Sequence, residues 1–169
     1  MLIRALILVI ILSFYGCGYK PVSSYSKEAL GESVFVDVES SLEDPENTVL
    51  IKDAINDVLV SRFHARLTSK KDAKVKLRLK LKKVLFEPIR YDRNGFVTAY
   101  NTRVELSTEY ESLKGKKTIV TTGEYAFPIE SNSVISDTKR FEAIKNASKK
   151  AIDEFISKIA VEGLLYDGK

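Results

Sequence analysis

The sequence predicts one α+β domain, a two-layer sandwich in which two helices cover one face of a mostly antiparallel four-stranded sheet. Residues 74–81 and 96–111 alternate apolar and polar side chains, which is typical of strands with one buried face. Residues 45–66 and 137–163 instead repeat apolar side chains every three or four positions, as amphipathic helices do. The segments follow the order β-α-β-β-β-α, and packing two helices on one sheet face buries their apolar sides.

The first predicted elements are a strand and a helix. Residues 33–40 carry valines at every second position, which predicts a strand with one apolar face. Asp44-Pro45-Glu46 then supplies a helix N-cap, a proline at the first helical position and an acidic first turn. The apolar spacing of residues 51–63 extends this helix to about Arg66.

The middle of the chain predicts a long β-hairpin. Its first strand begins with the strict alternation of residues 74–81 (KVKLRLKL), and the alternation slips at Lys82-Lys83, where we expect a β-bulge. Asp92-Arg93-Asn94-Gly95 has the composition of a tight turn. Residues 96–111 then return as the second strand.

A fourth strand and a second helix complete the domain. Lys114-Gly115 marks a turn, and the apolar residues of 119–129 mark a strand that must end or lie at a sheet edge by Pro128. Asp137 is the predicted N-cap of the final helix, which we expect to end near Gly163.

The N-terminus predicts a targeting segment. Residues 1–16 hold 13 apolar residues and one cation, and their uninterrupted apolar stretch, Ala5 to Leu12, is too short to span a membrane but fits a secretory signal. The only cysteine, Cys17, follows at once and resembles the lipidated first residue of a mature bacterial lipoprotein, although Phe14 and Tyr15 depart from its usual signal. We therefore divide the chain into a signal peptide (1–16), an acylated cysteine with a tether (17–32) and one domain (33–169). The alternative is an ordinary secretory signal or an uncleaved anchor.

Composition excludes several classes of function. One cysteine and one histidine cannot build a Cys₄, Cys₂His₂ or three-histidine metal site. A nucleophile–histidine pair could use only His64, for which we favour a structural or solvent-facing role. We therefore expect no catalytic residue, no metal and no cofactor. The net charge of +4 is small for a chain with 27 cations and 23 anions, so we expect no nucleic-acid partner.

One strand carries an unusual row of cations. Residues 74–82 place five basic side chains on one polar face, which could hold a polyanion. Arg90 and Arg93, near aromatic residues at the hairpin tip, would extend the row toward a ligand with phosphates and apolar chains. The alternative is a solvated ladder of ion pairs. A turn centred between Arg93 and Asn94 sets the facing residues as Lys82 with Glu105, Arg78 with Glu109 and Lys76 with Glu111, and leaves Lys80 and Lys74 uncompensated.

The lipoprotein signal, the Cys17-Gly18-Tyr19 start and a single β-α-β-β-β-α domain together resemble the lipopolysaccharide-assembly lipoprotein family, LptE. The resemblance implies an outer-membrane protein on the periplasmic side, held by N-terminal acyl chains, that plugs the β-barrel LptD and binds lipopolysaccharide without catalysis. Gly18 is similar to the residue after the cysteine in lipoproteins sent to the outer membrane. The candidate lipopolysaccharide contacts are Lys74, Lys76, Arg78, Lys80, Lys82, Arg90 and Arg93. The alternative is another surface-anchored lipoprotein, one that regulates cell-wall synthesis or serves a different envelope transporter.

Overall fold

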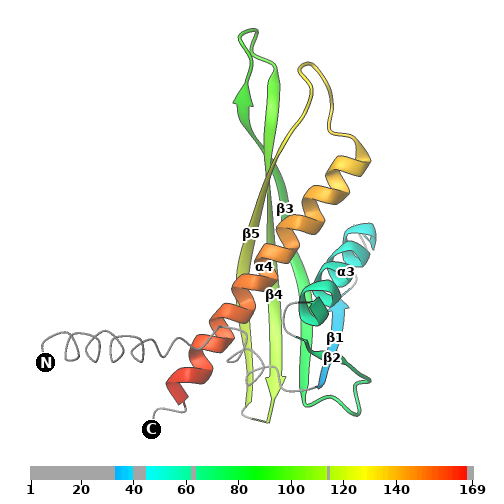
Figure 1. The fold of residues 1–169 in the computed structure, drawn as a ribbon, viewed down its shortest axis with the longest axis vertical. Coiled ribbons are helices and arrows are strands. Elements are labelled where there is room, and N and C mark those ends of the chain that lie inside the picture. The colour runs from blue at the N-terminus through cyan, green and yellow to red at the C-terminus, as the bar shows by residue number, and fades with distance from the viewer. Residues whose placement is uncertain (1–32, 40–44, 62–63, 114, 167–169) are drawn as a thin grey trace, which may run out of the picture.

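The computed structural model describes residues 33–39, 45–61, 64–113 and 115–166 (Figure 1). The predicted signal peptide, Cys17 and the tether lie outside these residues. Within them, no helix is both long and apolar enough to cross a membrane.

The described residues form a five-stranded sheet in the order β2-β1-β3-β4-β5. Its strands are β1 (Ser33–Glu39), β2 (Arg66–Leu67), β3 (Val75–Tyr91), β4 (Val97–Ser112) and β5 (Gly115–Pro128). The three long strands make the predicted antiparallel meander, whereas β1 runs parallel to both β3 and β2. The predicted fold class is confirmed, and the sheet gains a fifth strand of two residues.

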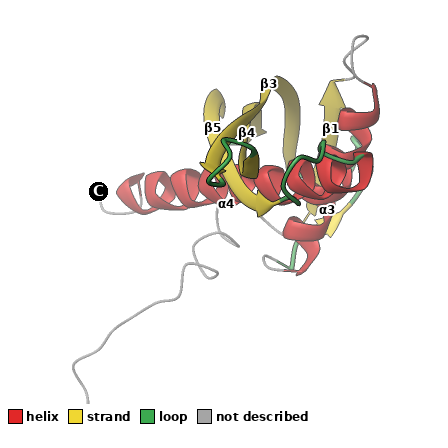
Figure 2. Ribbon diagram, turned by 90° about the horizontal axis from the view of Figure 1, so that it is seen from above, coloured by secondary structure: helices red, strands yellow, loops and turns green. Residues whose placement is uncertain are grey.

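Both described helices, α3 (Pro45–Ser61) and α4 (Asp137–Tyr166), lie on the same face of the sheet (Figure 2). The core fills the space between these layers with aliphatic side chains and one phenylalanine. Fully buried members include Ile51, Ile55, Leu79, Leu106 and Phe155. The opposite face of the sheet has no helix against it among the described residues, and there the polar side chains of each strand are placed.

The two predicted helix ends are wrong. α3 ends at Ser61 instead of Arg66, and Arg66 instead begins β2. The chain reverses direction between α3 and β2. There His64 adopts a left-handed φ of 52°, and the Ala65 N–H donates a hydrogen bond to the Leu59 carbonyl at 3.0 Å. α4 continues through Gly163 to Tyr166, because a glycine weakens a helix interior by about 1 kcal/mol without breaking it.

The hairpin register is as predicted from Lys76 to Leu81 and is shifted by one or two residues between the bulge and the turn. Lys76 pairs with Glu111, Arg78 with Glu109 and Lys80 with Ser107. The expected bulge is present between Leu81 and Lys83, and it consumes one residue, so Lys83 rather than Lys82 faces Glu105. The predicted pairing of Lys82 with Glu105 is therefore wrong.

Candidate functional site

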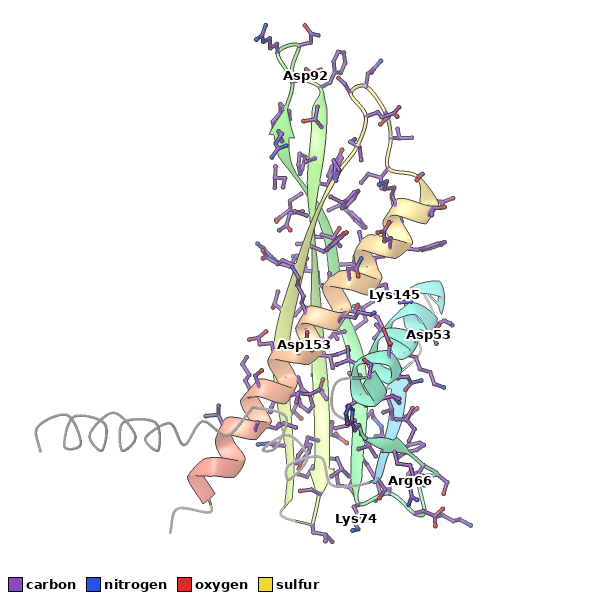
Figure 3. All side chains as sticks on the ribbon, viewed as in Figure 1. Asp53, Arg66, Lys74, Asp92, Lys145 and Asp153 are labelled. Atoms are coloured by element: carbon purple, nitrogen blue, oxygen red, sulfur yellow. The ribbon has the colours of Figure 1, made fainter. Side chains whose placement is uncertain are left out.

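The candidate residues are spread along the whole length of the hairpin. Figure 3 labels Lys74 and Asp92 at opposite ends of the molecule. β3 has 17 residues, and at about 3.3 Å per residue it spans roughly 55 Å. Five of the seven candidates thus form two groups, one on the helix-free sheet face and one at the hairpin tip.

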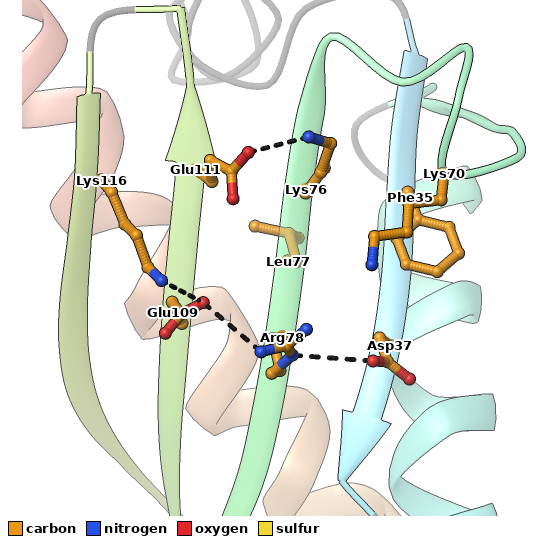
Figure 4. Close-up of a pocket in the computed structure, with 9 residues that line it drawn as sticks. All are labelled: Phe35, Asp37, Lys70, Lys76, Leu77, Arg78, Glu109, Glu111 and Lys116. Carbon is orange, nitrogen blue, oxygen red and sulfur yellow. Dashed lines mark hydrogen bonds and ion pairs between the residues drawn. The ribbon is translucent and has the colours of Figure 1, made fainter.

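On the sheet face, the cations of β3 are held by carboxylates on both sides (Figure 4). Lys76 Nζ lies 2.8 Å from Glu111 Oε1, and Lys80 Nζ lies 2.6 Å from Glu39 Oε1. Arg78 is flanked by two carboxylates, with its Nε 3.6 Å from Asp37 Oδ2 and a terminal nitrogen 3.9 Å from Glu109 Oε1. The prediction that Lys80 is uncompensated is therefore wrong.

The carboxylates of β1 were missed because the sequence did not place β1 beside β3. The register Asp37↔Arg78 and Glu39↔Lys80 brings an acidic strand against the basic one. A signal for this was present in the order strand, helix, strand over residues 33–81, because a helical crossover is the usual connection between parallel neighbours. The alternation of residues 33–40 predicts only an apolar and a polar face for β1.

These charges line an open hollow of about 270 Å³ near the start of β3. Its lining is basic and acidic in near-equal measure, with one aromatic ring: Phe35, Asp37, Lys70, Lys76, Leu77, Arg78, Glu109, Glu111 and Lys116. The pairing continues along the same face, where Arg103 Nε lies 2.7 Å from Glu124 Oε1. The sheet face is therefore a mosaic of alternating charges.

The ion pairs of this sheet face are weak enough for an anionic ligand to replace their carboxylates. The side chains of Lys80 and Glu39 are about half exposed, and exposed pairs contribute roughly 0 to 1 kcal/mol. The hydrogen bond from Lys80 lowers the pKa of the Glu39 carboxyl, and that from Lys76 lowers the pKa of Glu111. An anionic ligand on β3 would compete with resident carboxylates that stay ionised at neutral pH.

The hairpin tip differs from the sheet face because its cations have no ion pair among the described residues. Arg90 and Arg93 are exposed there. Ile89, Tyr91 and Phe96 are also exposed, by 52%, 57% and 43%, and Figure 1 shows the tip projecting beyond the helix layer. Cationic and apolar groups thus share one end of the molecule.

Asp92 holds the tip in shape. Its Oδ1 accepts from the backbone N–H of Asn94 at 2.8 Å and of Phe96 at 2.9 Å, and its Oδ2 accepts from the Ser131 hydroxyl. The Ser131 hydrogen bond and then those from the backbone lower the pKa of Asp92. Its role is structural, and it also ties the tip to the loop between β5 and α4.

The two remaining candidates lie outside these groups. Lys74 precedes β3, and its backbone N–H donates to the Ser33 carbonyl and hydroxyl oxygens at 3.2 and 3.1 Å. Lys82 is the bulged residue and is exposed. Neither has an ion pair within the part of the chain that the structure describes.

Sequence reasoning missed a second basic surface, on the first half of α4. Arg140 lies over the ring of Phe86, 5.1 Å from its centroid, and Lys150 lies 6.0 Å from that of Tyr125. Further exposed cations on the same stretch are Lys139 and Lys145. The signal was the charge of residues 139–150, in which only Glu142 is acidic, but this helix was read only for its apolar spacing.

The described geometry offers exposed cationic and aromatic side chains for binding a ligand. Within residues 33–39, 45–61, 64–113 and 115–166, no three His, Cys, Asp or Glu side chains are grouped to hold a metal ion. His64 is exposed in the segment between α3 and β2.

Comparison with known proteins gives one family. The sequence profile of the family described as LptE, lipopolysaccharide-assembly, matches residues 34–159. Among curated protein sequences, none matches the chain at a significant level.

Solved structures share the fold at low sequence identity. Rare lipoprotein B from Shewanella oneidensis is 14% identical, with a TM-score of 0.50 over 79% of this chain and 98% of that one. A Xanthomonas campestris protein assigned to the DUF330 family is 8% identical, with a TM-score of 0.51 over 82% of this chain and 88% of that one. At such identities the likeness establishes the fold alone.

Proposed function

The chain belongs to the LptE family of lipopolysaccharide-assembly proteins, and from this premise we propose that it is a lipid-anchored outer-membrane protein that plugs an LptD-like β-barrel and binds lipopolysaccharide. The observation that carries the proposal is the profile match, which spans residues 34–159 and so nearly the whole described domain. The role is non-catalytic.

The anchor and the fold together set the orientation of the domain relative to the membrane. Acyl chains on Cys17 fix the N-terminus in the inner leaflet of the outer membrane, and two or more chains make such anchoring stable. β1 starts beside the first residues of β3, with Val34 paired to Val75, so the domain begins at the end opposite the hairpin tip. The roughly 55 Å length of β3 exceeds the 40–45 Å thickness of a bilayer. Standing upright in a barrel, the domain carries its tip to the far side of the membrane.

The charges support two kinds of contact with lipopolysaccharide, which presents phosphates beside acyl chains. At the tip, Arg90 and Arg93 meet phosphates while the exposed rings of Tyr91 and Phe96 meet apolar chains. Lys74 and Lys82 are available in the same way. On the sheet face, Lys76, Arg78 and Lys80 bind phosphate only by exchanging their carboxylate partners. We therefore assign the tip the larger share of the affinity.

Recovery of partners tests the proposed function. The full-length, membrane-anchored protein is purified in mild detergent, and co-purifying proteins are identified by mass spectrometry. We expect an outer-membrane barrel of the LptD type. Recovery of a peptidoglycan synthase in its place would instead support the regulator of cell-wall synthesis.

A charge-reversal triplet tests lipopolysaccharide binding. Lys80→Glu, Arg90→Glu and Arg93→Glu together should weaken lipopolysaccharide binding by the purified full chain at least tenfold. The matched control reverses three other exposed cations, Lys52, Arg66 and Lys71, and so makes the same change in net charge. Equal lipopolysaccharide binding by the two triple variants would contradict the proposed contacts.

A further inference from the structure

β5 is an edge strand with a long open side. The sheet order places it last, and its only strand partner among the described residues is β4. Along an antiparallel edge, every second residue turns its backbone N–H and C=O away from the sheet. Such an edge is a template for pairing with another chain unless something covers it.

Two side chains of α4 occupy the middle of this edge. Glu154 Oε2 accepts a hydrogen bond from the Thr122 N–H at 2.8 Å, and Lys158 Nζ donates to the Val120 carbonyl at 3.2 Å. The two side chains are also bonded to each other, with 2.8 Å between Lys158 Nζ and Glu154 Oε1. Figure 1 shows the lower half of α4 crossing β5 and continuing past the sheet edge. We call these two residues the edge clamp.

The segment under the edge clamp is the part of β5 most suited to pairing. Residues 118–123 (TIVTTG) carry no charge and contain five consecutive β-branched residues. Val120 is 48% exposed on the helix-free face. Uncharged β-forming segments of about six residues at an open edge are a known hazard for aggregation.

The edge also complements itself. In an antiparallel pair with its two-fold axis at Val120, each Thr122 faces Thr118 of the second copy, and each Lys116 faces Glu124. The uncharged run would then lie against itself between two pairs of opposite charges. The Val120 carbonyl and the Thr122 N–H, which the edge clamp occupies, are both used in this register.

We propose that the edge clamp of Glu154 and Lys158 blocks β5 from pairing with β5 of a second copy of this chain. While the edge clamp is in place the domain stays a monomer, as the proposed function, a plug in one barrel, requires. Removing the clamp uncovers the backbone groups of Val120 and Thr122 and lets two copies join through a continuous sheet.

A disulfide across the proposed axis provides the test. In this register the two Val120 residues form a hydrogen-bonded pair with Cα atoms about 5.5 Å apart, a distance that suits a disulfide. The full-length chain carrying Val120→Cys is oxidised in mild detergent, with and without Glu154→Ala and Lys158→Ala, and dimers are counted on non-reducing gels. The chain without Val120→Cys corrects for any contribution from Cys17.

We expect the fraction of disulfide-linked dimer to rise at least fivefold when the edge clamp is removed. Lys158→Ala alone, a milder change, should give a smaller rise. The matched control is Glu142→Ala with Lys145→Ala, two exposed α4 residues of the same charges, which should leave the fraction unchanged. Equal dimer with the clamp intact or removed, an equal rise in the control, or a cross-link to a different protein would overturn the proposal.

Discussion

Lys80 of β3 is bonded to Glu39 of β1 across a parallel strand pair, with 2.6 Å between Nζ and Oε1. This contact changes how the row of basic side chains on β3 is interpreted. A cation that should have been free for a ligand already has a partner, and its partner comes from a strand 41 residues away. The sheet face is therefore balanced, and its affinity for anions depends on how easily the carboxylates give way.

Removing the Glu39 carboxylate should make Lys80 available. We expect Glu39→Gln to tighten lipopolysaccharide binding about two- to fivefold, because an exposed ion pair of up to about 1 kcal/mol no longer competes. Titration of the full chain with fluorescent lipopolysaccharide measures the change, and Glu142→Gln on α4 is the control for net charge. Unchanged affinity would show that Lys80 does not contact the ligand.

The same pair predicts a pH dependence. Its hydrogen bond from Lys80 lowers the pKa of Glu39 below the ordinary value of 4.5. A carboxyl whose pKa is lower in the folded state stabilises the fold fully above the unfolded pKa, and this contribution is lost as the pH falls through the folded pKa. We expect carbon-detected NMR to place the Glu39 midpoint below 4.5 and Lys80→Met to raise it. A Glu39 midpoint that does not change in Lys80→Met would contradict the ion pair between Lys80 and Glu39.

The sequence predicted best what depends on neighbouring residues. Alternation identified the faces of β3 and β4, and the slip at Lys82-Lys83 located a bulge, because each follows from the two-residue period of a strand. The predicted register does not hold beside the turn, where Tyr91 faces Val97, and it holds from Lys76 to Leu81 only because the bulge after Leu81 shifts the pairing back by one residue.

What escaped prediction depends on contacts between distant segments. Nothing local to residues 33–39 says that β1 lies beside β3, yet this placement supplies Asp37 and Glu39 to the row. The edge clamp likewise arises because α4 crosses β5, so two ordinary helix charges meet a strand backbone. α3 ends at Ser61, and His64 beyond it adopts a left-handed conformation, for which a non-glycine residue gives little warning.

Asp92 should control the order of the hairpin tip. Asp92→Ala removes the acceptor of the Asn94 and Phe96 amides, so we expect their hydrogen exchange to accelerate about tenfold. Asp92→Asn keeps a side-chain oxygen at that position and should exchange nearly as slowly as the parent. If the Asn94 and Phe96 amides exchange equally slowly in Asp92→Ala, the backbone of the turn alone keeps the hairpin tip ordered.

Gly123 should be essential for the contact between α4 and β5. A Cβ at this position would lie 2.5 Å from the Ala151 nitrogen and still closer to the Ala147 carbonyl oxygen, so the obstacle is helix backbone rather than a movable side chain. Gly123→Ala must therefore push α4 away from a layer that includes buried Ala147 and Ala151. Overpacking of this kind costs about 1 to 3 kcal/mol, and we expect the melting temperature to fall by roughly 3 to 12 °C in a thermal scan.

The control for this prediction is Thr118→Ala, an exposed position on the same strand. It should change the melting temperature by much less, because it adds no atom beneath the helix. Ala147→Gly should not rescue Gly123→Ala, since the obstructing oxygen belongs to the backbone and remains in place. A melting temperature of Gly123→Ala equal to that of the parent would show that α4 can withdraw freely, and that the helix is held to β5 by the edge clamp rather than by close packing.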